Sequence, residues 1–413
     1  MNEKKTPRIR FKGFTDDWEQ RKLGEVATIE RGGSPRPIDA YITDASDGLN
    51  WVKIGDAPEQ GRYINHTEEK IKPSGLSKTR QVFPGDLILS NSMSFGKPYI
   101  MGIPGCIHDG WLLIRNSQNV FDLKFLCHML GTDQMLKQYQ SLAAGSTVNN
   151  LNKELVSNAV VSVPNKPEQQ RIGAFLESID DVITLHQRKY EKLQIIKKSM
   201  LENCFPKNGE KVPRIRFAGF TGDWEQRKFG DENDLLTGYP FESKKYVEEG
   251  ITLIRGMNVK RGYLDLSDEN CMKWSSSEGL ESYLLEDGDI LIQMDGALIG
   301  KSYARIAQNQ LPALLVQRVT RARTKKDIAN SDFMYQTIQR NFLSYIKMNK
   351  TETAVPHLSL NDIRDFIIMV PSLAEQIKIG EYFTNIDKLI TLHQSKLEKL
   401  QKIKKSLLER MFA

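Results

Sequence analysis

The chain has 413 residues, of which 39% are hydrophobic and 27% charged, enough for two or three globular domains that each bury a core. Its net charge of +6 permits binding to nucleic acid but does not require it. The four cysteines include no C-x-x-C pair, which argues against a disulfide framework or a zinc site and fits a cytoplasmic protein. No apolar run of about 18 residues is present to span a membrane, and the charged N-terminal segment is not a signal peptide.

The beginning of the chain is repeated near its middle. Residues Pro7–Glu25 read PRIRFKGFTDDWEQRKLGE and residues Pro213–Asp231 read PRIRFAGFTGDWEQRKFGD, with 15 of 19 positions identical. A second pair of segments, Pro167–Phe205 and Ala374–Phe412, shares 23 of 39 positions. The two offsets, 206 and 207 residues, are far longer than the period of a solenoid. The sequence therefore predicts a duplicated unit of one globular domain followed by one helix.

Between the repeated segments the two halves diverge. Val26–Leu142 resembles Glu232–Met348 only at a few framework points, such as Gly85–Leu89 beside Gly288–Ile292. We therefore expect one scaffold that carries two different surfaces. The expected boundaries are 1–165 for the first globular domain, 166–206 for the first long helix, 207–372 for the second domain and 373–413 for the second helix.

Both C-terminal repeats are predicted to be long helices. Pro164 and Pro371 precede them, and Glu168 and Glu375 lie in the first turns, where the helix dipole favours negative charge. Apolar side chains recur in steps of four and three residues, which is a heptad pattern. The positions expected to pair the helices are Ile172, Leu176, Ile179, Ile183 and Leu193 in the first copy, and Ile379, Phe383, Ile386, Ile390 and Leu400 in the second.

A helix of roughly 35 residues is about 50 Å long, which is too long to be buried by one small domain. We expect the two helices to pair antiparallel, with a globular domain at each end; the alternative is that each helix packs on its own domain. Lys197-Lys198 and Lys404-Lys405 are interpreted as solvated faces or partner contacts. His186 and His393 lie at matching seam positions and are interpreted as core residues without a chemical role.

The order of these features resembles the specificity subunit of type I restriction-modification systems. The features are the domain starts Trp18–Gly24 and Trp224–Gly230, the Val-Pro and Glu-Gln pairs that open each long helix, and the repetition of that helix. The resemblance covers essentially the whole chain. It implies an α+β fold in which two mixed α/β target recognition domains are separated by a two-helix antiparallel coiled coil, with pseudo-two-fold internal duplication.

The resemblance also implies a function in bacterial defence for a chain that has no catalytic centre, cofactor or metal of its own. Each domain would read one half of a bipartite site in double-stranded DNA, and the paired helices would set the spacer. Two methyltransferase subunits, docked on the helices, and two restriction subunits would supply the chemistry of S-adenosylmethionine, ATP and magnesium. Reading one face of B-DNA twice needs half-sites about 34–36 Å apart, a span that such helices can bridge.

Candidate DNA contacts lie in polar or glycine-rich loops that differ between the halves but occupy matching places. Residues 31–36 match 237–241, residues 91–97 match 294–301, and residues 145–149 match 350–354. Basic and amide or hydroxyl side chains can bond base edges or phosphates. The candidates are Arg31, Ser34, Arg36, Asn91, Lys97, Ser146, Thr147 and Asn149 in the first half, and Tyr239, Arg255, Lys301, Thr351 and Thr353 in the second.

Two other functions are considered. Asp234 with Glu242 and Lys244 is the pattern of a metal-dependent nuclease, although the first half has no counterpart. Alternatively, the globular halves bind proteins, which would make the chain a coiled-coil adaptor. Against an enzyme, the chain has no Asn-Pro-Pro-Tyr methyltransferase motif, and Gly296–Ser302 has three residues between its glycines where a P-loop needs four.

Overall fold

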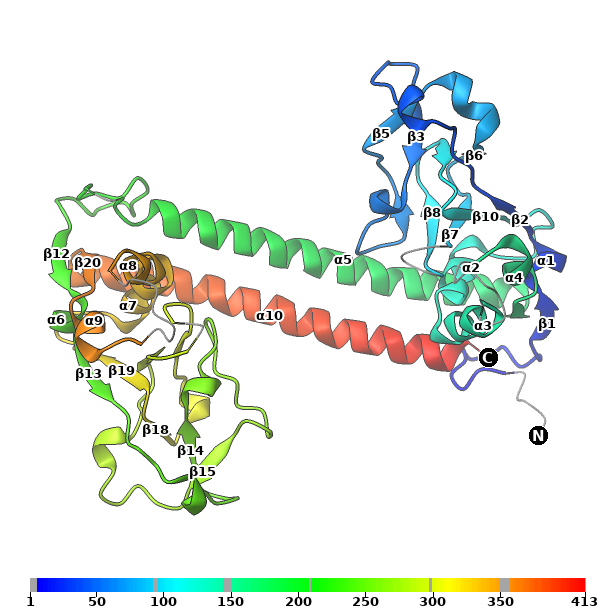
Figure 1. Ribbon diagram of the computed structural model, residues 1–413. Coiled ribbons are helices and arrows are strands. Elements are labelled where there is room, and N and C mark those ends of the chain that lie inside the picture. The colour runs from blue at the N-terminus through cyan, green and yellow to red at the C-terminus, as the bar shows by residue number, and fades with distance from the viewer. Residues whose placement is uncertain are drawn as a thin grey trace. The chain divides into compact units, whose positions relative to one another are not determined.

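The computed structural model describes residues 6–91, 96–143, 151–207, 209–296, 299–349 and 357–412. The chain divides into two compact units: unit 1 is Met1–Lys189 with His393–Ala413, and unit 2 is Tyr190–Leu392. Each unit contains a mixed α/β domain and parts of two long helices, α5 (Lys166–Asn203) and α10 (Leu373–Met411) (Figure 1). Among the described residues, no helix combines the length and the apolar character that crossing a membrane requires.

The domain of unit 1 is built on three sheets. A two-stranded sheet pairs β1 (Glu19–Lys22) antiparallel with β11 (Val160–Val163). The five-stranded sheet has the order β2-β10-β7-β8-β4, with β2 (Thr28–Arg31), β4 (Tyr63–Ile64), β7 (Leu87–Ser90), β8 (Pro98–Met101) and β10 (Trp111–Arg115). The four-stranded sheet has the order β5-β3-β9-β6, with β3 (Leu49–Val52), β5 (Glu69–Ile71), β6 (Arg80–Val82) and β9 (Gly105–Ile107).

Helices cover one face of the five-stranded sheet. They are α1 (Leu23–Val26), α2 (Leu123–Leu130), α3 (Asp133–Ala143) and α4 (Lys153–Ser157). The short 3-10 helices η1 (Ile38–Ala40), η2 (Ile54–Asp56) and η3 (Pro73–Lys78) lie elsewhere in the domain. Alternate residues of β7 face different cores: Leu87 and Leu89 join the cluster with α2, whereas Ile88 joins a second cluster with Trp111. Because both faces are covered, β7 and β10 are almost continuously apolar.

Unit 2 repeats this plan with different lengths. Its pair is β12 (Glu225–Lys228) with β20 (Ile367–Val370), and its four-stranded sheet has the order β13-β19-β16-β17, with β13 (Asn233–Thr237), β16 (Ile290–Gln293), β17 (Tyr303–Arg305) and β19 (Val319–Thr324). A three-stranded sheet has the order β15-β14-β18, with β14 (Ile251–Ile254), β15 (Met272–Trp274) and β18 (Ala313–Leu315). The helices are α6 (Phe229–Glu232), α7 (Ser331–Thr337), the π-helix η8 (Ile338–Phe342), α8 (Leu343–Asn349) and α9 (Leu360–Arg364), with 3-10 helices η4 (Ser243–Lys245), η5 (Gly256–Asn258), η6 (Glu281–Tyr283) and η7 (Gln308–Gln310).

The same buried joint attaches each long helix to the domain that precedes it. In unit 1, Arg10 donates two hydrogen bonds to the fully buried Glu168, at 2.6 and 2.8 Å. In unit 2, Arg216 does the same to Glu375, at 2.8 and 2.7 Å. These carboxylates, expected only to complement the helix dipole, are in fact the centres of bidentate ion pairs, which are among the stronger hydrogen-bonded contacts.

The glutamine that follows each carboxylate completes the joint. The side-chain carbonyl of Gln169 accepts from the Asp122 N–H, and its amide donates to the Pro164 carbonyl. Gln376 repeats this with the N–H of Asn330 and the carbonyl of Pro371. The Glu-Gln pair at the start of each helix is therefore explained by two successive buried contacts.

The other end of each long helix enters a domain core. Phe412, just after α10, lies 5.3 Å from Phe125 and 6.4 Å from Trp18 between ring centroids, all within unit 1. In unit 2, Phe205 after α5 lies 5.7 Å from Trp224 and stacks on Phe333 at 5.4 Å. The two tryptophans are buried packing residues of the repeated scaffold, as expected from the sequence.

The long helices also contact each other within each unit. In unit 1, Asp180 of α5 pairs with Lys404 of α10, and the Nδ1 atoms of His186 and His393 lie 2.8 Å apart. Residue numbers rise along α5 as they fall along α10, so these segments are antiparallel. In unit 2, Lys197 Nζ lies 2.6 Å from the Asp387 carboxylate. The interpretation of Lys197 and Lys404 as solvated is therefore wrong, because each is a largely buried interhelical ion-pair partner.

Candidate nucleic-acid interface

The predicted loops of unit 1 converge on one turn, residues 108–110, between β9 and β10. The Gly32 N–H donates to the Trp111 carbonyl and the Asn91 N–H to the Gly110 carbonyl, both at 2.9 Å. The Leu151 N–H donates to the Asn91 carbonyl at 3.2 Å. These bonds join residues 31–36, Asn91, 108–111 and Leu151, which we call loop cluster 1.

Unit 2 has the same backbone frame, which we call loop cluster 2 (residues 237–241, 294–296, 316–319 and 357–358). The Gly238 N–H donates to the Val319 carbonyl at 3.1 Å, and the Met294 N–H donates to the Arg318 carbonyl at 2.9 Å. The Leu358 N–H donates to the Met294 carbonyl at 2.7 Å. The loops that were matched through the sequence therefore occupy equivalent places in the two units.

A glycine is required at the start of each cluster. A Cβ atom on Gly32 would lie 2.1 Å from the His108 carbonyl oxygen, and one on Gly238 would lie 2.3 Å from the Val316 carbonyl. Both contacts are with backbone atoms, which cannot move aside without breaking the strand ends. The close approach fixes loops 31–36 and 237–241 against rigid strands, which is a precise support for side chains that bind a ligand.

Polar groups in loop cluster 1 gather around Asp109. Its Oδ1 atom accepts from the Ser34 hydroxyl and pairs with His108 Nε2, both at 3.0 Å. Its carbonyl accepts from the Asn91 amide at 2.9 Å and from Arg31 Nε at 3.4 Å. Its Oδ2 atom lies 3.5 Å from Arg36 Nη2. Four of the residues predicted from the sequence thus meet at Asp109, which the sequence did not single out: Ser34 and Arg36 contact its carboxylate, and Arg31 and Asn91 its backbone carbonyl.

Loop cluster 2 carries different side chains on the equivalent backbone frame. Arg318 Nη1 lies 2.8 Å from the Asp295 carboxylate, and the Arg318 side chain is largely exposed. Tyr239 is partly exposed and packs edge-on against Phe241 and Tyr283. Gln317 is exposed beside them. The two clusters therefore share a scaffold but offer a different pattern of donors and acceptors.

The remaining candidates fall in three groups. Lys97 and Lys301 are exposed and each follows a glycine of positive φ, Gly96 at 75° and Gly300 at 73°. Arg255 is half-buried and donates to the Asn270 carbonyl at 2.8 Å, so it supports the fold of a neighbouring loop. The others lie outside the described residues: Ser146, Thr147, Asn149, Thr351 and Thr353.

The predicted helix-pairing residues have two kinds of surroundings. Ile172 and Leu176 belong to the domain core of unit 1, and Ile379 and Phe383 to that of unit 2. The helix starts therefore pack on the domain that precedes them. Further along the helices the predicted positions are buried at Ile183 and Ile386 and partly buried at Ile179, Leu193, Ile390 and Leu400.

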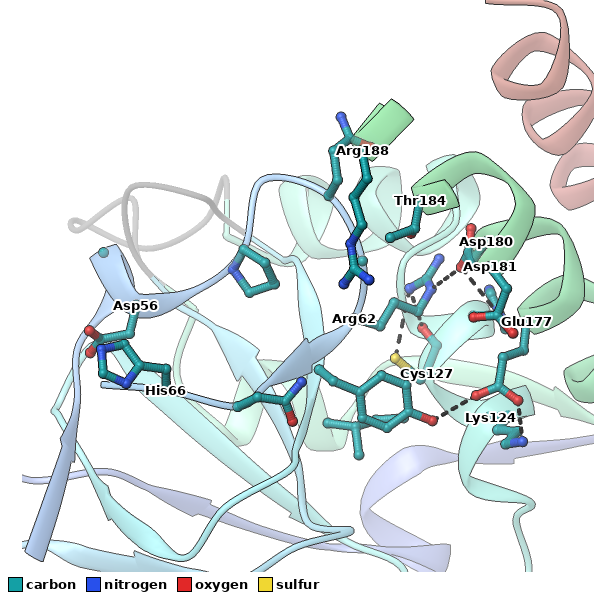
Figure 2. A pocket seen from close by; sticks show the side chains of 18 of the residues that line it. Asp56, Arg62, His66, Lys124, Cys127, Glu177, Asp180, Asp181, Thr184 and Arg188 are labelled. Atoms are coloured by element: carbon teal, nitrogen blue, oxygen red, sulfur yellow. Dashed lines mark hydrogen bonds and ion pairs between the residues drawn. The ribbon is translucent and has the colours of Figure 1, made fainter. Parts of the chain in front are cut away.

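A cavity of about 520 Å³ in unit 1 was not predicted from the sequence (Figure 2). It lies where the loop around residues 55–68 meets α2 and α5. Arg62 Nε donates to Asp180 at 3.0 Å, and the Tyr63 hydroxyl donates to Glu177 at 2.7 Å, as Figure 2 shows. Beneath them His128 is buried, and burial together with the charges of Arg62 and Lys404 holds its pKa well below the ordinary value. This wall attaches the α/β domain of unit 1 to α5.

The acidic residues considered for a nuclease are engaged elsewhere. Glu242 pairs with Lys245 at 2.8 Å, and Asp234, on β13, lies 3.9 Å from Lys325. All four side chains are largely exposed.

Comparison with known proteins gives the family. A model of the type I restriction modification DNA specificity domain matches the chain twice, at residues 15–194 and 222–402. The specificity subunit of the type I restriction enzyme MjaVIII of Methanocaldococcus jannaschii is 21% identical over 404 residues, which are 95% of this chain and 91% of that protein. The EcoAI specificity subunit of Escherichia coli is 25% identical over 256 residues, covering 59% of this chain and 40% of that protein.

A solved structure has the same fold. The crystal structure of the type I restriction-modification S subunit from M. genitalium matches with a TM-score of 0.67 and 15% sequence identity, and the match covers 99% of both chains. The predicted α+β class, with two duplicated domains that are each followed by a long helix, is confirmed. The two family matches span most of the sequence, and the chain therefore belongs to the specificity subunits of type I restriction-modification systems.

Proposed function

We propose that loop clusters 1 and 2 read the two unlike halves of a bipartite DNA sequence, and that the chain itself catalyses no reaction. The observation that carries this proposal is the shared backbone frame with different side chains. Direct readout needs donors and acceptors held at fixed places against base edges. A frame that is kept while its side chains change is suited to reading two different half-sites.

The helices offer two matching places for partner subunits. Val182 and Leu185 of unit 1 and Leu389 and Leu392 of unit 2 occupy equivalent repeat positions, and all four are exposed. Exposed apolar side chains that cluster on a helix indicate a protein-protein contact. We propose that one methyltransferase subunit docks at each place. The two restriction subunits then join the complex, in the cytoplasm, and the partners supply the chemistry of S-adenosylmethionine, ATP and magnesium.

Methylation profiling tests the reading function. A host that expresses this chain with its methyltransferase should carry methylated adenine or cytosine at one bipartite motif. Replacing Val26–Leu142 with the same region of a related subunit should change one half of that motif and leave the other half and the spacer unchanged. A motif without a spacer, or a swap that changes both halves, would contradict two independent readers.

Native mass spectrometry of the purified complex tests the docking places. Leu185→Glu and Leu392→Glu should each remove one methyltransferase subunit, because a charge cannot be buried in an apolar contact without a large cost. Ile195→Glu is the matched control, since Ile195 is also exposed on α5 but its repeat equivalent is Lys402. Loss of both subunits from a single variant would contradict two separate sites.

A further inference from the structure

We propose that Arg36 of loop cluster 1 bonds the guanine of one G·C base pair, and that Asp109 is the residue that sets its direction. This inference rests on the proposed reading function and names one base pair within the half-site of unit 1. Arginine bonds guanine through O6 and N7 together, and this bidentate contact is the commonest specific contact in the major groove. A guanidinium that is oriented before DNA arrives favours this contact, because less conformational freedom is lost on binding.

The Asp109 carboxylate is fixed on one side. The His108 Nδ1 atom accepts the Gly110 N–H at 2.8 Å, and His108 Nε2 lies 3.0 Å from Asp109 Oδ1. Ser34 donates to the same oxygen, and the Asn91 amide holds the Asp109 carbonyl. Oδ1 therefore has a hydrogen bond from Ser34 and a close contact with His108, and the carboxylate cannot turn without losing both.

The other carboxylate oxygen is directed to the surface. Oδ2 lies 3.5 Å from Arg36 Nη2, and the Arg36 side chain is 81% exposed, whereas that of Asp109 is 32% exposed. One terminal nitrogen of the guanidinium thus lies beside the carboxylate, and most of the Arg36 side chain faces solvent. That is the arrangement a bidentate guanine contact needs, because the fork of donors is oriented from behind.

The second unit does not have this pair. Gly32 and Gly238 occupy equivalent places on the turns that contain His108 and Val316, so Asp109 corresponds to Gln317. Pro37 and Glu242 are the equivalent N-caps of η1 and η4, so Arg36 corresponds to Phe241. Phe241 is buried and carries no charge. Loop cluster 2 has its own ion pair, Arg318 with Asp295, at a different place on the frame. Removal of the Arg36–Asp109 pair should therefore affect only the half-site that unit 1 reads.

The test is methylation profiling of hosts that carry the full complex with Arg36→Lys, Asp109→Asn or, as the matched control, Arg318→Lys. Lysine keeps the charge but loses the two-donor fork. With Arg36→Lys, the preference for G·C over other pairs at one position of one half-site should fall by about 5- to 150-fold. Asp109→Asn should relax the same position, and Arg318→Lys should leave that half-site unchanged.

The possible results separate the claims. Unchanged motif and methylation level in Arg36→Lys would overturn the guanine contact, because a phosphate contact tolerates lysine. A uniform loss of methylation without a change of motif in Arg36→Lys would also overturn it. A normal motif in Asp109→Asn beside a relaxed one in Arg36→Lys would overturn the orienting role of Asp109. If the unaltered chain gives no bipartite motif, the proposed reading function itself is wrong.

Discussion

Truncation of the phenylalanine at the end of each long helix should destabilise one unit at a time. Phe412 and Phe205 are 7% and 3% exposed, and each contacts a buried tryptophan and a second phenylalanine of its unit's core. Replacing a buried phenylalanine by alanine costs about 3–5 kcal/mol, since apolar contact is lost and a cavity remains. Phe412→Ala should therefore weaken unit 1, and Phe205→Ala should weaken unit 2.

This loss of unfolding free energy should lower the thermal midpoint of the affected unit substantially. For units of about 200 residues, each kcal/mol lowers the midpoint by about 2–4 °C, so either variant should lose at least about 6 °C in its own transition. Hydrogen exchange assigns the loss to a unit: protection in β1 and β11 should fall with Phe412→Ala, and protection in β12 and β20 should fall with Phe205→Ala.

Exposed aromatic residues supply the controls. Phe83 in unit 1 is 49% exposed and Tyr263 in unit 2 is 61% exposed. Their replacement by alanine should change the midpoints little. If Phe412→Ala were no more harmful than Phe83→Ala, the helix end would not be part of the core, and the reasoning would be refuted.

Three further predictions concern buried charges in unit 1. Glu168→Gln should lower the free energy of unfolding by about 3 kcal/mol, measured in urea, because Arg10 keeps its charge but loses its bidentate partner. Asp180→Asn should lower the free energy of unfolding by a similar amount. Lys404→Met should lower it by less than about 1 kcal/mol, because burial and, to a smaller extent, the charge of Arg62 already lower the pKa of Lys404. Stability should fall as the pH drops below the ordinary histidine pKa of 6.5, because the depressed pKa of His128 means that the folded state binds fewer protons than the unfolded state. In His128→Gln, the thermal midpoint should therefore depend less on pH between about pH 7 and pH 5.

Each of these has an internal comparison. Glu375→Gln should weaken unit 2 by a similar amount, since its ion pair with Arg216 has the same geometry; no effect from either change would contradict the joint. Lys405→Met, at a 69% exposed side chain, should be neutral, and a larger loss there than with Lys404→Met would contradict the assignment of Lys404. A pH dependence that persists in His128→Gln would assign the acid sensitivity to other groups, such as His393, whose pKa is also lowered by burial and by His186.

The sequence was most informative where the chain could be compared with itself. The repeated ends predicted the duplicated domains and the long helices, and matching framework points placed the loops that form clusters 1 and 2. The role of Glu168 was assigned only to the helix dipole, although its partner Arg10 lies in the other repeated segment. A search for opposite charges that recur in both pairs of repeated segments would have predicted this ion pair.

Nothing in the sequence pointed to Asp109. It lies in the diverged region, where its counterpart is Gln317, and its role depends on contacts with Ser34 and Arg36 that only the folded strands bring together. Phe205 and Phe412 were missed for another reason: the heptad pattern stops before them, and burial of a helix end in a distant domain is a tertiary contact that periodicity does not report.

Unit 1 is built from two stretches of sequence that are far apart, and this arrangement delays the completion of its core during synthesis. Residues 393–412 leave the ribosome only after the whole of unit 2, which at 5–20 residues per second means a delay of about 10–40 s. Until then the pocket around Trp18 lacks Phe412 and exposes apolar surface that chaperones and proteases recognise. A chain interrupted anywhere in unit 2 would therefore lack the part of the unit 1 core that Met411 and Phe412 supply.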